Sequence, residues 1–215
     1  MGLTSDLLEQ NTIMYGLQLQ TQHLGPLHHF YSEIVGFPIL NETHTYFRTQ
    51  VGATILDFEQ VNHSAQYCFR IGLPMESFNM EMDNLSARVD IKSRRSVFHP
   101  KLKHTWYFHD PSNNIVELSP DRYNEPRITG IVMLVEDTVK VGEQLESLGL
   151  TCRFTDQFRC IFQNPDDRTD IILIKTRVNQ YSSGQQAVTI PTVQSSVNAT
   201  VCLENTSHYL YMVKS

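Results

Sequence analysis

The chain has 215 residues, of which 40% are hydrophobic and 19% charged, so it can bury one large core or two smaller ones and is not a disordered protein. Its net charge of -6 argues against a nucleic-acid partner, because neutralising phosphates requires clustered lysine and arginine. No apolar run approaches the roughly 20 residues that cross a bilayer, and the polar first ten residues lack a signal-peptide core, so a cytoplasmic protein with no membrane contact is expected.

A first structural unit is predicted between residues 12 and 60. Apolar and polar residues alternate over 14–20, which predicts a strand. Apolar residues at helical spacing then predict a helix over 24–35 that ends at Gly36. Three further strands are predicted to complete the unit, over 38–41, 45–49 and 53–59.

The same order of elements is predicted again in the next part of the chain. It begins with an apolar strand over 65–71 and continues with a helix over 75–88. The polar stretch 90–103 is expected to form a strand edge and a long loop. The copy ends in a hairpin, in which the turn Asp110-Pro-Ser-Asn-Asn114 joins an aromatic strand to an apolar one.

A third copy follows a turn-rich linker, 121–126. Its strand, helix and three further strands are predicted over 127–135, 138–148, 151–155, 158–163 and 170–175. Asp137 is expected to cap the helix and Gly149 to end it. The last strand runs through Ile171–Leu173 without a glutamate, so no carboxylate role is expected in this copy. After a polar connector over 176–197, two short strands, 200–203 and 209–213, are expected to form a terminal hairpin in place of a fourth copy.

Glu117 is the unusual residue of the hairpin, because it is a carboxylate within the apolar run Ile115-Val-Glu-Leu118. Burying it without a partner would cost several kcal/mol, so it must face water, a cation or a hydrogen-bond donor. A solvated strand face is the simplest interpretation, and a site residue is the alternative.

Two segments resemble motifs of the vicinal-oxygen-chelate superfamily, which contains glyoxalase I, extradiol dioxygenases, fosfomycin-resistance enzymes and bleomycin-binding proteins. The first segment runs from Tyr107-Phe108 through Asp110-Pro111 and Asn114 to Glu117-Leu118. It is similar to the signature "aromatic, Phe, x, Asp-Pro, x, x, Asn, x, x, Glu-Leu". The second segment, Phe30-Tyr-Ser-Glu-Ile-Val-Gly-Phe37, is similar to a helix ending of the same family.

The resemblance implies an α+β fold of repeated βαβββ units whose mixed sheets form half-open barrels. Because two such units make one barrel in this family, a complete domain is expected over 12–120. A degenerate second half with a C-terminal hairpin is expected over 127–215. Family members often dimerise, so a homodimer is expected as well.

The resemblance also implies four metal-ligand positions, which fall on Gly16, Asp57, Gln66 and Glu117. Gly16 departs from the pattern, because glycine has no side-chain ligand. The implied set is therefore Asp57, Gln66 and Glu117, whose oxygen donors suit Mg or Mn better than Zn, Ni or Fe. Glu117 is also the expected catalytic residue. Six residues are expected to bind the ligand: Gln18, Gln20, Arg70, His104, Trp106 and Tyr107.

Two functions remain open at this point, and both have a small organic molecule as partner. The first is a glyoxalase-like or dioxygenase-like enzyme that uses a divalent metal ion. The second is a metal-free protein that binds or sequesters a drug-like or aromatic molecule, as bleomycin-resistance proteins do. The missing fourth ligand counts against the first function. An assembly role of the C-terminal half is a third interpretation.

Overall fold

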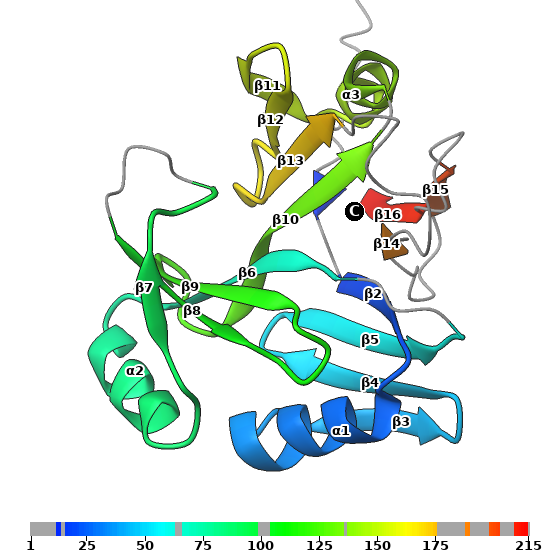
Figure 1. Ribbon diagram of the computed structural model, residues 1–215. Helices are drawn as coiled ribbons and strands as arrows, with labels where there is room; N and C mark the ends of the chain where they lie inside the picture. The colour runs from blue at the N-terminus through cyan, green and yellow to red at the C-terminus, as the bar shows by residue number, and fades with distance from the viewer. Residues whose placement is uncertain are drawn as a thin grey trace, which may run out of the picture.

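The computed structural model describes residues 12–13, 16–62, 66–98, 104–135, 137–175, 188–189, 198–202 and 209–214. Within them, a strand, a helix and three further strands recur three times, as predicted (Figure 1). The first unit consists of β2 (Gly16–Thr21), α1 (Leu24–His29) with its continuation η1 (Phe30–Val35), β3 (Ile39–Thr43), β4 (Tyr46–Val51) and β5 (Thr54–Gln60). The second consists of β6 (Cys68–Pro74), α2 (Phe78–Ser86), β7 (Lys92–Arg94), β8 (Thr105–His109) and β9 (Ile115–Asp121). The third consists of β10 (Arg127–Val135), α3 (Thr138–Ser147), β11 (Thr151–Thr155), β12 (Arg159–Gln163) and β13 (Asp170–Lys175).

The described residues outside these units form four short strands: β1 (Thr12–Ile13), β14 (Val188–Thr189), β15 (Asn198–Cys202) and β16 (Tyr209–Lys214). β15 and β16, which lie where the two terminal strands were predicted, pair antiparallel. Apart from β14, the whole of the predicted connector 176–197 lies outside the described residues, as do positions 14–15, 65 and 203 of predicted strands and 99–103 of the predicted loop.

The predicted helix ends are confirmed where a specific residue makes them. Gly36 adopts the left-handed conformation, with φ of 89°, and its N–H bonds to the Tyr31 carbonyl. The carboxylate of Asp137 accepts hydrogen bonds from the N–H groups of Val139 and Lys140 and so caps α3. One difference lies inside the first helix, whose second half is π-helical.

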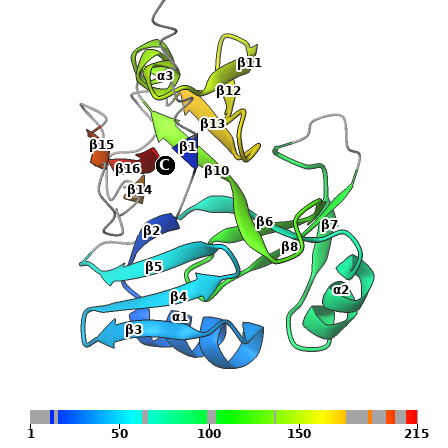
Figure 2. The same ribbon diagram turned by 180° about the vertical axis from the view of Figure 1, so that it is seen from behind.

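The strands form two eight-stranded sheets. In each unit the first strand lies parallel to the last and the unit's other neighbouring strands are antiparallel, so both sheets are mixed as expected. The first sheet has the order β1-β16-β14-β2-β5-β4-β3, with β15 beside β16. The second has the order β11-β12-β13-β10-β6-β9-β8-β7. Each helix lies beside the strands of its own unit (Figure 1, Figure 2).

The units pair differently from the sequence prediction. β6 of the second unit pairs antiparallel with β10 of the third, whereas β2 of the first unit pairs with β14. Each sheet therefore takes strands from both sides of the predicted boundary between 12–120 and 127–215. The first strand of every unit has one edge that is not paired within its unit. The pattern of apolar residues does not specify which strand of another unit will pair with that edge.

The core lies between the sheets and their helices. On the second sheet, the side chains of Phe69, Ile71, Val116 and Leu118 face this core and are at most 2% exposed. The alternating residues, among them Arg70 and Glu117, must point to the opposite side, which is called the polar face below. In the part of the chain that the structure describes, no helix has the length and apolar character needed to span a bilayer.

Candidate functional site

A row of polar residues crosses the middle of the second sheet on its polar face. Strand register aligns Tyr107 with Glu117, Glu117 with Arg70, and Arg70 with Gly130. The same row continues through Asp170 on β13 to Gln163 on β12. Because matched positions on neighbouring strands share one face, these side chains lie on one surface. The row therefore brings together three of the predicted site residues, Tyr107, Glu117 and Arg70.

Arg70 occupies the centre of this row and is almost completely buried. Its Nε donates to Thr129 Oγ1 at 2.8 Å, and its Nη2 donates to the Thr129 carbonyl and to Asp170 Oδ2, each at 2.8 Å. The guanidinium carbon lies 4.7 Å from the centre of the Phe98 ring. Asp170 also accepts a 2.9 Å hydrogen bond from Gln163. This is a buried charge pair whose hydrogen bonds offset the cost of removing it from water.

Asp170 corrects a sequence-based expectation. The third unit was expected to contribute no carboxylate, because its last strand lacks a glutamate. In the structure, Asp170 is the first residue of β13 and pairs with Arg70 across β10. The sequence pattern concealed this role, because an aspartate directly after a turn is usually a turn residue.

Glu117 is also buried, and its partners come from the segment that follows β7. Ser96 Oγ donates to Glu117 Oε1 at 2.5 Å, and the Val97 N–H donates to Oε2 at 3.2 Å. The next residue, Phe98, is 2% exposed and packs against Ile161 and Ile172. Residues 96–98 thus cover the middle of the polar face and bind both oxygens of the predicted catalytic carboxylate.

The three predicted metal ligands do not come together. Asp57 lies on β5 of the first sheet, where Arg48 binds both of its oxygens at 2.8 Å. Gln66 is exposed and precedes β6, whereas Glu117 belongs to the second sheet. Both carboxylates thus already have donors, and the residue next to Glu117 in register is the cationic Arg70. This set does not fit a divalent cation.

The described residues contain no alternative metal site either. Among the residues that the structure describes, no group of three or more His, Cys, Asp or Glu side chains is arranged to hold a metal ion.

Four of the remaining five predicted ligand-binding residues lie outside the polar row. Gln18 and Gln20 lie on β2 of the first sheet, where Gln18 donates to Glu59 at 3.0 Å. His104 is exposed and precedes β8. Trp106 lies on the opposite face from Glu117 and packs against Phe78 of α2, with ring centres 5.4 Å apart. Tyr107 lies in the polar row, where Arg94 covers its ring at 4.7 Å.

A polar pocket of about 310 Å³ opens beside Arg70 on the polar face. Besides Arg70, it is lined by Ser119, Pro120, Asp121, Thr129, Gln163, Asp167, Arg168 and Asp170. Most of these residues come from the third unit, which the sequence interpretation left without a site. Their common position around one pocket could not be predicted from the sequence, because it depends on β6 and β10 being neighbours.

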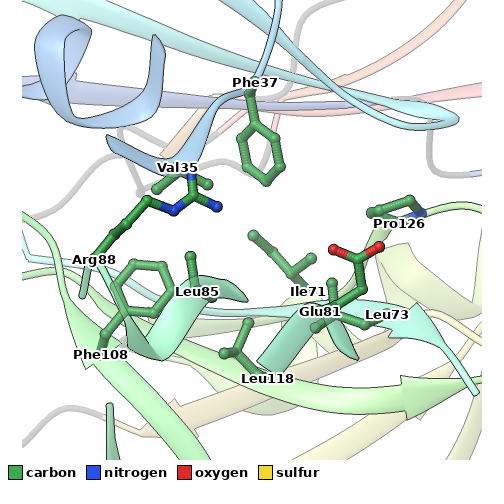
Figure 3. Close-up of a pocket in the computed structure, with 10 residues that line it drawn as sticks. All are labelled: Val35, Phe37, Ile71, Leu73, Glu81, Leu85, Arg88, Phe108, Leu118 and Pro126. Atoms are coloured by element: carbon green, nitrogen blue, oxygen red, sulfur yellow. The ribbon is translucent and has the colours of Figure 1, made fainter. Parts of the chain in front are cut away.

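A second pocket lies on the other side of the second sheet and is apolar. Figure 3 shows its floor of Ile71, Leu73 and Leu118, with Glu81 of α2 and Arg88, which follows that helix, at its edge. Its volume is about 60 Å³. An apolar cavity of about 150 Å³ is known to hold benzene, so this one has room for only a few non-hydrogen atoms. The polar pocket is therefore the stronger candidate site for an organic molecule.

Comparison with known proteins finds similar proteins by structure alone. No protein-family model and no curated protein sequence matches the chain. A solved "putative dioxygenase" from Bacillus subtilis subsp. subtilis str. 168 is similar over 84% of this chain and 70% of its own, with 14% identity and a TM-score of 0.61. Glyoxalase I from Zea mays is similar over 84% of this chain and 75% of its own, with 15% identity and a TM-score of 0.53. At such identities the likeness shows the fold, and it confirms the fold expected from the two motifs.

Proposed function

We propose that this chain, which has the vicinal-oxygen-chelate fold, binds a small polar organic molecule on the polar face of its second sheet without a resident metal ion. The observation that carries the proposal is the position of Arg70. Arg70 lies in register with Glu117 on the neighbouring strand, and its guanidinium forms an ion pair with Asp170 at 2.8 Å. Arginine is always charged in proteins, so it supplies a permanent cation at this point of the sheet.

Electrostatics supports a metal-free site. A divalent ion bound by Glu117 or Asp170 would have to compete with the Arg70 guanidinium, which already pairs with Asp170 at 2.8 Å and lies beside Glu117 in register. It would also have to displace the Ser96 and Val97 hydrogen bonds to Glu117. The polar pocket offers hydroxyl, amide and charged groups instead, and its volume of about 310 Å³ lies at the lower end of typical ligand sites.

The competing function is a metal-dependent enzyme of glyoxalase or dioxygenase type. The fold supports it, because the two structural relatives bear those names. In that case a metal ion would polarise two substrate oxygens, and Glu117 would be both a ligand and the proton carrier. The two functions make opposite predictions for metal content.

A homodimer is a separate proposal, which analytical ultracentrifugation would test.

The decisive experiment combines metal analysis with ligand binding. Purified protein would be analysed for bound metal and titrated with Mn, Zn, Ni and Fe(II), alongside Glu117→Gln and the matched surface variant Asp90→Asn. We expect no stoichiometric metal in any of the three. In parallel, a panel of small carboxylates, amines, amino acids and polyols would be screened by thermal shift. We expect a stabilising compound whose effect disappears in Ser119→Phe, which fills the pocket. Stoichiometric metal that is lost only in Glu117→Gln would overturn the proposal.

A further inference from the structure

We infer that the polar pocket binds a small zwitterion, whose carboxylate contacts Arg168 and whose ammonium contacts Asp121. This inference rests on the proposed function, because it names the ligand class of the same pocket. It depends on which charged groups of the lining already have partners and which do not.

Most of the lining charge is neutralised within the protein. Arg70 pairs with Asp170 at 2.8 Å, and Asp167 pairs with Arg127 at 3.2 Å, and all four side chains are buried. Arg168 and Asp121 differ, because neither forms an ion pair with another residue of the described ranges. The pocket therefore presents one cation and one anion to a ligand.

The backbone holds Arg168 in a conformation that arginine does not favour. Its φ is 58°, in the left-handed region, and its N–H bonds to the Asn164 carbonyl at 2.9 Å. The second unit has the corresponding turn, where Asn113 has a φ of 60° and bonds to the Asp110 carbonyl at 2.9 Å. Asparagine tolerates this region, whereas a long side chain is strained there. An arginine at the strained position, with its side chain lining the pocket, suggests that its charge serves a ligand.

Gly72 allows the carboxylate of Asp121 to lie against the sheet. A Cβ atom at Gly72 would come within 2.6 Å of Asp121 Oδ2 and 2.8 Å of Thr129 Cγ2. A side chain at this position would thus force the Asp121 carboxylate out of its present position. The other oxygen, Oδ1, accepts the Arg122 N–H at 2.7 Å, which fixes the orientation of the carboxylate.

These features select a ligand with two charges. A simple carboxylate would satisfy Arg168 but would remove water from Asp121 without replacing its hydrogen bonds, and a simple amine would do the reverse. A molecule with one carboxylate and one ammonium satisfies both groups. The Ser119 hydroxyl and the Gln163 amide, which also line the pocket, can bond to its polar atoms.

The test is calorimetric titration of the full chain with compounds of graded length and charge. The series is glycine, β-alanine, 4-aminobutanoate and 5-aminopentanoate, with butanoate and butylamine as single-charge controls. We expect one chain length to bind best. Each single-charge control should bind at least about tenfold more weakly than 4-aminobutanoate, because it lacks one charge-assisted hydrogen bond. Asp121→Asn should reduce the difference between 4-aminobutanoate and butanoate to within about twofold.

Arg168→Asn gives an additional readout, because asparagine suits the left-handed position. It should weaken 4-aminobutanoate binding about tenfold or more while raising the melting temperature. Arg153→Asn, which changes an exposed arginine on β11 outside the pocket, should leave binding unchanged. Equal affinity for butanoate and 4-aminobutanoate would overturn the zwitterion inference and leave the proposed function intact, as would binding of a polyol but of no amino acid. If no compound of the wider polar panel binds, the proposed function fails as well.

Discussion

The hydroxyl of Tyr31 donates a 2.9 Å hydrogen bond to Asp110 Oδ2, and both side chains are buried. Each residue belongs to one of the two sequence motifs that resemble the superfamily. Asp110 also accepts the N–H groups of Ser112 and Asn114 and the side-chain amide of Asn114. The motif aspartate thus closes the hairpin turn and fastens it to the helix of the first unit. Its role here is structural, which explains why the motif can identify a fold without identifying an activity.

Removing the Tyr31 hydroxyl should destabilise the protein. Tyr31→Phe leaves Asp110 with one donor fewer in a buried site, so we expect a loss of about 1–3 kcal/mol in the free energy of unfolding. Urea unfolding would measure it. The matched control is Tyr123→Phe, whose hydroxyl is bonded to the exposed Arg122 and whose loss should cost less than about 0.5 kcal/mol. Equal effects of the two substitutions would contradict the structural role of Tyr31.

Acidification should reveal the burial of Asp110. Burial raises the pKa of this carboxyl, although the hydrogen bonds from Asn114, Tyr31 and Ser112 lower it in part. The folded state therefore binds the proton more tightly than the unfolded state, whose pKa is about 3.9. The contribution of protonated Asp110 to the free energy of unfolding is fully present below the unfolded-state pKa. It is lost as the pH rises through the folded-state pKa.

Comparison with Asp110→Asn isolates this dependence, because the variant cannot titrate at this position. We expect the unfolding free energy of the wild type, minus that of the variant, to fall as the pH rises from about 4 and then to become constant. Chemical denaturation at a series of pH values would measure it. A difference that rises over this range would show that hydrogen bonding outweighs burial at Asp110.

Breaking the central ion pair should be costly. Arg70→Met leaves Asp170 buried beside an apolar side chain, so we expect a loss of about 3–5 kcal/mol in the free energy of unfolding. Adding Asp170→Asn should recover part of that loss, because no unpaired charge then remains. A double-mutant cycle by chemical denaturation would measure the coupling. Arg159→Met is the control, since its 3.5 Å pair with Asp156 is partly exposed and should contribute less than about 1 kcal/mol. Strictly additive losses for Arg70 and Asp170 would contradict the pairing.

Thiol labelling should distinguish two cysteines. Burial raises the pKa of the Cys68 thiol to about 11, and the Glu117 charge adds to the shift. Cys152 is exposed on the edge strand β11. Because the thiolate is the reactive form, iodoacetamide at pH 8 should modify Cys152 well before Cys68. Peptide mass spectrometry over time would show the order, and urea-unfolded protein, in which the two rates should become similar, is the control. Labelling of Cys68 first in the folded protein would mean that the polar face is open at residues 96–98.

Some structural features of this protein could be predicted from its sequence and others could not, depending on whether a feature is determined by local or by distant residues. The helix ends at Gly36 and Asp137 were predictable, because each depends on the local preference of a single residue. The hydrogen-bond donors to Glu117 were not predictable, although a buried carboxylate clearly needs a partner. Ser96 and Val97 belong to a polar stretch without periodicity, and only the folded chain shows that it crosses the sheet.

The polar pocket was beyond prediction for a related reason. Arg70 meets Asp170 across β10, one hundred residues along the chain. That contact exists only because the first strands of the second and third units pair with each other. Strand periodicity predicts which face of a strand is apolar, but it does not predict which strand lies beside it.

The pairing of β2 with β14 also affects how the chain can fold as it leaves the ribosome. All strands of the second sheet lie between Cys68 and Lys175, so this sheet can close as soon as that stretch has emerged. β2 is made early, but its partner at Val188–Thr189 is made late. At roughly 5–20 residues per second, the edge of β2 is uncovered for about ten to thirty seconds. An open strand edge of this kind is a site for pairing with other chains, so chaperone binding during translation should concentrate on the first unit.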